Sequence, residues 1–253
     1  MKVKFSDLKN KRVFVTGGGS GIGASIVENF CEQGSEVYFV DINLKSSSKL
    51  INKIKKKKFR VPKFIECDLL NISKLEKILK KIIFSKGPIQ VLVNNAANDN
   101  RHKTKQVDEK YWENRIAINL KHYFFAAKEV VDGMKKNKGG SIVNLSSVSW
   151  MLGEGDKVVY ETAKSAVIGL TRSFAQEFGK YNIRTNTVIP GSIATERQIK
   201  RWLTPKYKKN ILDKQALKRQ LKPNDVAQIV LFLSSDQSSG CTKQSFVIDG
   251  GII

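Results

Sequence analysis

Residues that build metal sites, disulfide frameworks or membrane spans are scarce in this 253-residue sequence. The three cysteines, Cys31, Cys67 and Cys241, lie far apart and show no metal-ligand spacing. The two histidines, His102 and His122, are too few to supply a zinc site, so we expect no bound metal. No stretch reaches about 18 consecutive apolar residues, so we expect no membrane-spanning helix.

The amino-terminal stretch MKVKFSDLKNKR lacks the apolar core of a secretory signal peptide. Without such a signal, the cysteines are expected to be reduced thiols. Both features favour a cytoplasmic protein.

Acidic residues are also scarce, at 23 against 45 basic ones, which gives a formal net charge of +22 at pH 7. Nucleic-acid binding would favour a clustered, arginine-rich stripe interleaved with aromatic residues. Only nine of the basic residues are arginine, and the lysines are spread along the chain. We therefore interpret the charge as a solvated lysine surface and expect no nucleic-acid partner.

Short β-branched runs alternate along the chain with longer stretches of helical period. The predicted strands cover residues 12–16, 36–41, 61–68, 90–94, 141–147, 183–189 and 245–249. The predicted helices cover residues 22–33, a stretch from about 47, 72–84, 108–136 and 158–181. This order predicts one α/β domain over residues 1–253, a Rossmann-type doubly wound parallel sheet of about seven strands with helices on both faces.

Residues 192–221 interrupt this alternation with a long, polar and basic stretch that contains Trp202. A segment of this kind after a late strand is usually a lid over a binding site. We therefore expect a substrate lid at residues 192–221.

A glycine-rich stretch, TGGGSGIG at residues 16–23, lies between the first strand and the first helix. Glycines there allow a tight turn and the close approach of a pyrophosphate to the helix N-terminus. Asp41 ends the second strand, 24 residues beyond Gly17, where a carboxylate would hold the ribose hydroxyls of adenosine. It would also repel a ribose 2′-phosphate, which favours NAD over NADP, although Lys45 lies nearby.

Tyr160 and Lys164 are four residues apart, so they share one face of the predicted helix. An adjacent ammonium and a positive nicotinamide ring would stabilise the phenolate and lower the pKa of Tyr160 from its free value near ~10. The sequence therefore predicts Tyr160 as a general base.

The TGxxxGxG spacing resembles the short-chain dehydrogenase/reductase family, and further motifs of that family follow in order. They are Asp68-Leu69, Asn94-Asn95-Ala96, Asn119, Ser147, Tyr160-xxx-Lys164, and Pro190-Gly191 with Thr195. The resemblance runs from about residue 10 to Asp249-Gly250-Gly251. One departure is Ala97, where the family usually has glycine.

The resemblance implies a catalytic group of Asn119, Ser147, Tyr160 and Lys164. Ser147 would orient the substrate oxygen, Lys164 would also hold the nicotinamide ribose, and Asn119 would support a proton relay. The cofactor-binding residues that it implies are Gly17, Ser20, Gly21, Ile22, Gly23, Asp41, Asp68, Leu69, Asn95, Ala96, Tyr160, Lys164, Pro190, Ile193 and Thr195.

A polar cluster, NDNRH at residues 98–102, follows the fourth strand at the expected cofactor cleft. Such side chains can hydrogen-bond a polyhydroxylated substrate but would not form an acyl-chain tunnel. With SSVSW at 146–150, TERQ at 195–198, WLTP at 202–205 and Cys241-Thr242, the cluster resembles the NAD-dependent aldose 1-dehydrogenases of the family. That branch oxidises D-xylose, L-arabinose, L-fucose or D-galactose at C1 to an aldonolactone.

The sugar contacts predicted on this basis are Asn98, Arg101, His102, Ser147, Trp150, Tyr160, Gln198 and Trp202. Three of these residues have structural alternatives. His102 could bond a neighbouring helix or subunit, Arg101 could pair with Glu113 or Asp108, and Trp202 could pack within the lid.

Two other functions are compatible with parts of the sequence. The first is a 3-oxoacyl carrier-protein reductase or another carbonyl reductase of the same family; an acidic carrier would suit the basic surface, but Asp41 disfavours NADPH. A catalytically silent nucleic-acid-binding relative would use the net charge, but the intact Tyr160-Lys164 pair argues against it. The family resemblance also implies a homotetramer.

Overall fold

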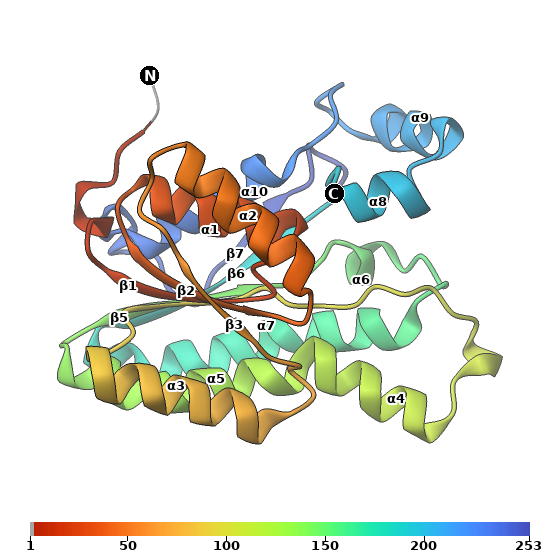
Figure 1. Ribbon diagram of the computed structural model, residues 1–253. Coiled ribbons are helices and arrows are strands. Elements are labelled where there is room, and N and C mark those ends of the chain that lie inside the picture. The colour runs from red at the N-terminus through yellow and green to blue at the C-terminus, as the bar shows by residue number, and fades with distance from the viewer. Residues whose placement is uncertain (1–2) are drawn as a thin grey trace.

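Seven runs rich in β-branched and aromatic residues form one parallel sheet in the order β3-β2-β1-β4-β5-β6-β7 (Figure 1). The computed structural model describes residues 3–253. Its strands are β1 (Arg12–Thr16), β2 (Glu36–Asp41), β3 (Lys63–Glu66), β4 (Val91–Asn94), β5 (Gly140–Leu145), β6 (Ile183–Pro190) and β7 (Ser245–Ile248). The predicted single-domain, doubly wound α/β fold is thus confirmed, with small differences in strand ends.

Helices cover both faces of the sheet (Figure 1). One face carries α1 (Gly21–Glu32), α2 (Leu44–Lys56) and α10 (Pro223–Ser234), and the other carries α3 (Ile72–Lys86), α5 (His122–Lys136) and α7 (Val158–Phe178). Neighbouring strand residues face opposite layers, so Val13 and Val15 pack in one buried cluster and Phe14 in the other. The sheet therefore has two apolar cores, one on each side.

The helix predicted at 108–136 forms as one helical stretch with a π turn inside it. It consists of α4 (Glu109–Ile116), a π-helical turn (Ala117–Lys121) and α5. A π turn accommodates one extra residue and is frequent at functional sites. The short helix α6 (Ser149–Leu152) and the helix α10 were not predicted.

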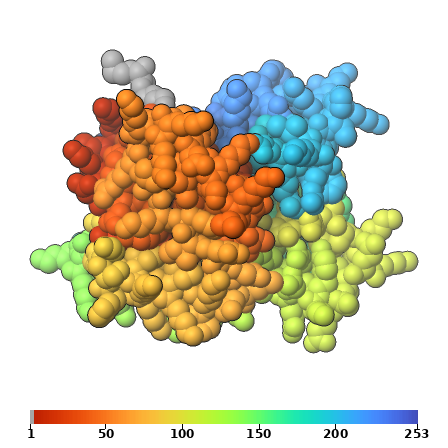
Figure 2. Space-filling model, in the orientation of Figure 1, coloured from red at the N-terminus to blue at the C-terminus, as the bar shows by residue number. Residues whose placement is uncertain are grey.

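The segment 192–221 contains two short helices, α8 (Glu196–Arg201) and α9 (Pro205–Lys214). Both begin at a threonine whose side chain accepts a backbone N–H of the first turn: Thr195 from Gln198 and Thr204 from Tyr207. Figure 2 shows this segment, in cyan to light blue, resting on the yellow chain that follows β4. It therefore lies over the carboxyl edge of the sheet.

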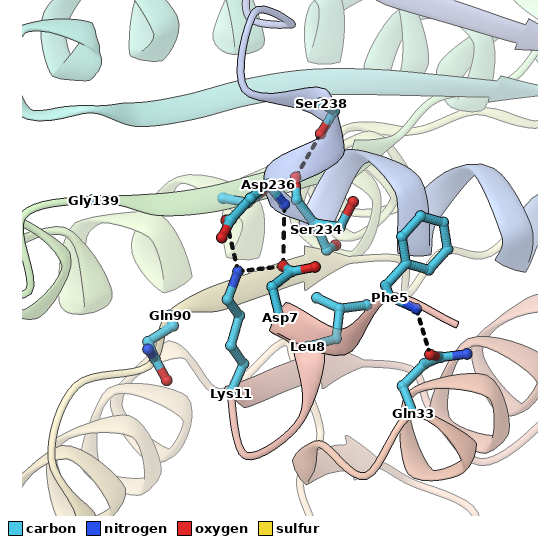
Figure 3. Close-up of polar contacts among 12 residues, drawn as sticks. Phe5, Asp7, Leu8, Lys11, Gln33, Gln90, Gly139, Ser234, Asp236 and Ser238 are labelled. Carbon is cyan, nitrogen blue, oxygen red and sulfur yellow. Dashed lines mark hydrogen bonds and ion pairs between the residues drawn. The ribbon is translucent and has the colours of Figure 1, made fainter. Parts of the chain in front are cut away.

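Polar contacts fix the opposite, amino edge of the sheet (Figure 3). The Lys11 ammonium donates to Asp7 at 2.7 Å and to Asp236 at 2.8 Å, which joins the chain before β1 to the end of α10. The backbone N–H of Phe5 donates to the side chain of Gln33 at 2.9 Å. Across residues 3–253, every helix is too short or too polar to cross a bilayer.

Candidate active site

A cavity of about 520 Å³ opens at the carboxyl edge of the sheet, where the loops after β1 to β6 meet. Ligands of doubly wound folds bind at this edge. Thirteen of the predicted cofactor residues line the cavity. They are Gly17, Ser20, Gly21, Ile22, Gly23, Asp41, Asp68, Leu69, Asn95, Ala96, Pro190, Ile193 and Thr195. Tyr160 lines it as well, whereas Lys164 is not among its described lining residues.

Two glycines of the first loop have no space for a side chain. Gly17 adopts a φ of +64°, and a Cβ there would lie 2.8 Å from the Cα of Ala96. A Cβ on Gly23 would lie 2.0 Å from the carbonyl oxygen of Gly17. The Ser20 side chain makes no capping hydrogen bond to α1. The first backbone N–H groups of α1 thus remain available for an anion at its N-terminus.

Asp41 lies at the end of β2 on the cavity wall. Its carboxylate accepts the backbone N–H of Gly19 at 2.8 Å and that of Asn43 at 2.9 Å. These bonds hold the carboxylate beside the glycine loop, where it can accept hydrogen bonds from ribose hydroxyls. The glycine cradle, the helix N-terminus and this acid together fit an adenine dinucleotide.

Ser147, in the chain after β5, and Tyr160, in α7, line the same cavity. The Ser147 hydroxyl lies 2.9 Å from that of Ser149. Burial raises the pKa of Tyr160, Asp99 adds to this rise, and a hydrogen bond from Ser147 opposes it. Burial of the phenolate thus opposes the predicted lowering of the Tyr160 pKa, which depends also on the positive nicotinamide ring and stays a prediction.

Lys164 is 1% exposed and belongs to the same polar group as Tyr160. Its ammonium donates to the Leu145 carbonyl at 2.7 Å and to the Tyr123 hydroxyl at 2.9 Å. It also lies 5.8 Å from the ring centroid of Tyr160. Burial lowers the pKa of Lys164 to about 7, and Asp99 opposes that shift. The lysine is thus adjacent to the tyrosine.

Asn119 lies in the π-helical turn and is fully buried. Its side chain accepts the backbone N–H of Asn98 at 2.8 Å and donates to the Arg115 carbonyl at 2.8 Å. It is not among the described residues on the cavity wall. In this arrangement Asn119 connects the broken helix to the chain that leaves β4.

Only part of the cluster at 98–102 lines the cavity, and the rest contacts other side chains of the protein. Asn98 and Asp99 line the cavity. The carboxylate of Asp99 accepts Arg197 at 3.0 Å and the Gln198 amide at 2.6 Å. Gln198, a predicted sugar contact, also lines the cavity but its amide N–H is engaged by Asp99.

Arg101 and Trp202 pack together and are not among the described cavity-lining residues. The Arg101 guanidinium lies 4.6 Å from the Trp202 ring and 5.6 Å from the Tyr207 ring. It also pairs with Asp156 at 3.0 Å, rather than with the predicted Glu113 or Asp108. These contacts connect the chain after β4 to the segment 192–221.

His102 and Trp150 are likewise not among the described cavity-lining residues. The Nε2 atom of His102 accepts the backbone N–H of Val159 at 3.3 Å, and its Nδ1 lies 3.0 Å from the Tyr111 hydroxyl. His102 thus takes the structural alternative of bonding neighbouring helices. His122 is buried and its Nε2 lies 3.2 Å from the Ala96 carbonyl oxygen.

Several wall residues were not singled out from the sequence. They include Glu154, Lys157, Tyr207 and Ile252. Glu154 and Lys157 lie shortly before Tyr160 in the sequence, and this proximity could have indicated that they lie at the site. Tyr207 and Ile252 come from α9 and the chain after β7, and their positions depend on how those parts fold back over the sheet.

The chain belongs to the short-chain dehydrogenase/reductase family. Residues 17–253 match the family model described as Enoyl-(Acyl carrier protein) reductase. The chain is 44% identical to a D-xylose 1-dehydrogenase of Caulobacter vibrioides, over 98% of this chain and 97% of that protein. It is 43% identical to the Probable galactose dehydrogenase GalD of Rhizobium meliloti, with the same coverage.

The fold is also similar to that of a solved member of the family. A short-chain type dehydrogenase/reductase from Mycobacterium ulcerans superposes with a TM-score of 0.91 at 25% sequence identity. The match covers 99% of this chain and 91% of that one. Family and fold thus agree over nearly the whole length.

Proposed function

We propose that the protein oxidises an aldose sugar at C1 to the aldonolactone with NAD. The main support is one cavity that combines a dinucleotide cradle with Ser147, Tyr160 and a polar wall. That wall includes Asp99 and Gln198, which suit hydroxyl groups better than an acyl chain. The similarity to a D-xylose and a galactose dehydrogenase supports the same small-molecule substrate class.

In this proposal NAD, when bound, accepts the hydride from C1 of the sugar. Tyr160 removes the proton of the C1 hydroxyl, and Ser147 hydrogen-bonds the same oxygen. The Lys164 ammonium stabilises the phenolate by its charge, and Asn119 positions the chain on which Asn98 lies. The products are the lactone, the reduced cofactor and one proton.

NAD rather than NADP is proposed because of Asp41. Its carboxylate faces the position expected for the adenosine ribose, and a 2′-phosphate there would meet a like charge. We also propose a homotetramer, since Trp112 of α4 and Phe124 of α5 expose apolar rings that a partner subunit would cover. The free thiols suit the proposed cytoplasmic location. Light scattering tests the oligomeric state.

A panel of aldoses with NAD, followed by NADH absorbance, tests the reaction. We expect turnover of a pentose or a 6-deoxyhexose and near-total loss in Tyr160→Phe. Turnover of 3-oxoacyl thioesters without any aldose would contradict the proposal and favour the carrier-protein reductase.

A further inference from the structure

We propose that Asp99 and Arg197 form a clasp that couples closure of the segment 192–221 to activation of Tyr160. This inference deepens the proposed function and rests on Tyr160 as its base. Arg197 acts through Asp99, so it is a positioning residue rather than a catalytic one. The clasp consists of the Asp99 carboxylate on the chain after β4 and the Arg197 guanidinium on α8.

The geometry of the clasp joins two separate parts of the cavity wall. Arg197 reaches Asp99 with Nε at 3.1 Å and Nη2 at 3.0 Å, and Gln198 adds a bond of 2.6 Å. Arg197 also donates to the Asn100 side chain at 2.6 Å. The described side-chain partners of Asp99 thus both come from the first turn of α8, so a movement of that helix would withdraw them together.

The two helices of the segment 192–221 have little apolar anchoring, whereas Ile193 and Leu221 near its ends are buried in the core. Within the described chain, neither α8 nor α9 contains a fully buried residue. Their position therefore depends mainly on polar and ring contacts, which include the clasp and the packing of Arg101 on Trp202. Backbone bonds from Ala216 and Leu217 to Gly251 and Gly250 hold the chain after α9. Segments with few buried contacts are those that open most readily.

Asp99 is the link to the base because it lines the same cavity as Tyr160. Its negative charge disfavours the phenolate and raises the pKa of Tyr160. An Arg197 guanidinium on the carboxylate offsets that charge, and withdrawing it restores the full repulsion. Closing the segment therefore makes deprotonation of Tyr160 easier at the moment when the substrate is enclosed.

Other charged groups around Tyr160 do not depend on α8. Glu154 and Glu161 also disfavour the phenolate, and Glu154 is itself paired with Lys157. Lys164 lies on the same helix as Tyr160, and the buried Tyr123 hydroxyl faces it from α5. Among the acidic groups that disfavour the phenolate, Asp99 is the one whose described ion pair comes from α8.

Matched variants on α8 test the clasp. Arg197→Gln and Lys200→Gln each remove one positive charge and one trypsin site from the same helix. Without any ligand, we expect trypsin to cut residues 192–221 several-fold faster in Arg197→Gln, and at the wild-type rate in Lys200→Gln. Equal cleavage rates in the two variants would overturn the clasp independently of any activity.

The coupling is tested by pH profiles of kcat/KM with a turned-over aldose. Arg197→Gln should raise the midpoint of the ascending, low-pH limb, where Tyr160 loses its proton, by roughly half a unit or more, while Lys200→Gln should leave it in place. Asp99→Asn should lower it, and the double variant should match Asp99→Asn alone. The same shift from Arg197→Gln in the Asp99→Asn background would refute the coupling.

Failure of the proposed function gives a different result. If the wild type turns over no aldose, the proposed substrate class is wrong, and Tyr160 is followed instead by tyrosinate absorbance with NAD bound. Each variant is also made with Tyr160→Phe added, and its absorbance gives the signal of the other tyrosines. A midpoint that rises in Arg197→Gln and falls in Asp99→Asn supports the coupling. Equal midpoints in these variants contradict it.

Discussion

The Nε2 atom of His102 accepts a hydrogen bond from the backbone N–H of Val159, the residue immediately before Tyr160. The chain after β4 is thereby attached to the first turn of the helix that carries the tyrosine. This places His102 beside the cavity wall as a support for α7.

Removing this support should cost stability and activity together. In His102→Leu the buried N–H of Val159 loses its acceptor, which typically costs about 1–3 kcal/mol. We expect a fall of that size in the free energy of unfolding, measured in urea, and a lower kcat. A lost affinity for the sugar with unchanged stability would instead show that His102 contacts the substrate.

The glycine cradle predicts a steric block of the cofactor. Gly23→Ala places a methyl 2.0 Å from the Gly17 carbonyl oxygen, so the loop must move. We expect NAD to bind at least about tenfold more weakly by calorimetry, roughly 1.4 kcal/mol. Gly240→Ala is the matched control, because a Cβ there has no described atom within 4 Å. Comparable affinity in both variants would contradict the cradle.

The carboxylate of Asp41 predicts the choice of cofactor. In Asp41→Asn the charge is lost while an oxygen remains to accept the Gly19 N–H. Hydrogen bonds to charged groups contribute about 1.5–3 kcal/mol, so KM for NAD should rise roughly tenfold or more. KM for NADP should fall, because the repulsion of its 2′-phosphate is removed. An unchanged ratio of the two KM values counts against this role.

Burial of Lys164 predicts a pH-dependent contribution to stability. Its folded pKa of about 7 lies below its ordinary value of 10.5, so between these values the unfolded chain holds one more proton. Stability therefore rises with pH across this window, and the cost of burying the ammonium is fully present below it. Urea unfolding at several pH values should show this rise relative to Lys164→Met. A difference that stays constant with pH argues against a depressed lysine pKa.

The sequence predicted most of the elements that build the cofactor half of the cavity. The order of strands follows from alternating apolar runs, and residues such as Gly17 and Asp41 have positions set by the ends of those strands. Both follow from the apolar periodicity and from the order of the elements, and both of these can be read from a sequence.

The substrate half was harder to predict because it depends on the pairing of side chains. The sequence allows Arg101 to contact either a sugar or an acidic side chain. In the structure it pairs with Asp156 and packs on Trp202. Gln198 could face a ligand and instead donates to Asp99. Likewise, the pKa of Tyr160 depends on how much water the surrounding loops exclude. The four-residue spacing between Tyr160 and Lys164 does not indicate how deeply the tyrosine is buried.

The widened turn at Ala117–Lys121 holds one residue more than a regular α-helical turn. Because the turn takes up the extra residue, its deletion would restore a regular α-helix and leave α4 and α5 nearly in phase. Deleting Asn119 itself would remove the side chain that bonds the backbone of Asn98, while Tyr111 would stay beside His102. Such a shortened chain would separate the contribution of this amide from that of the histidine.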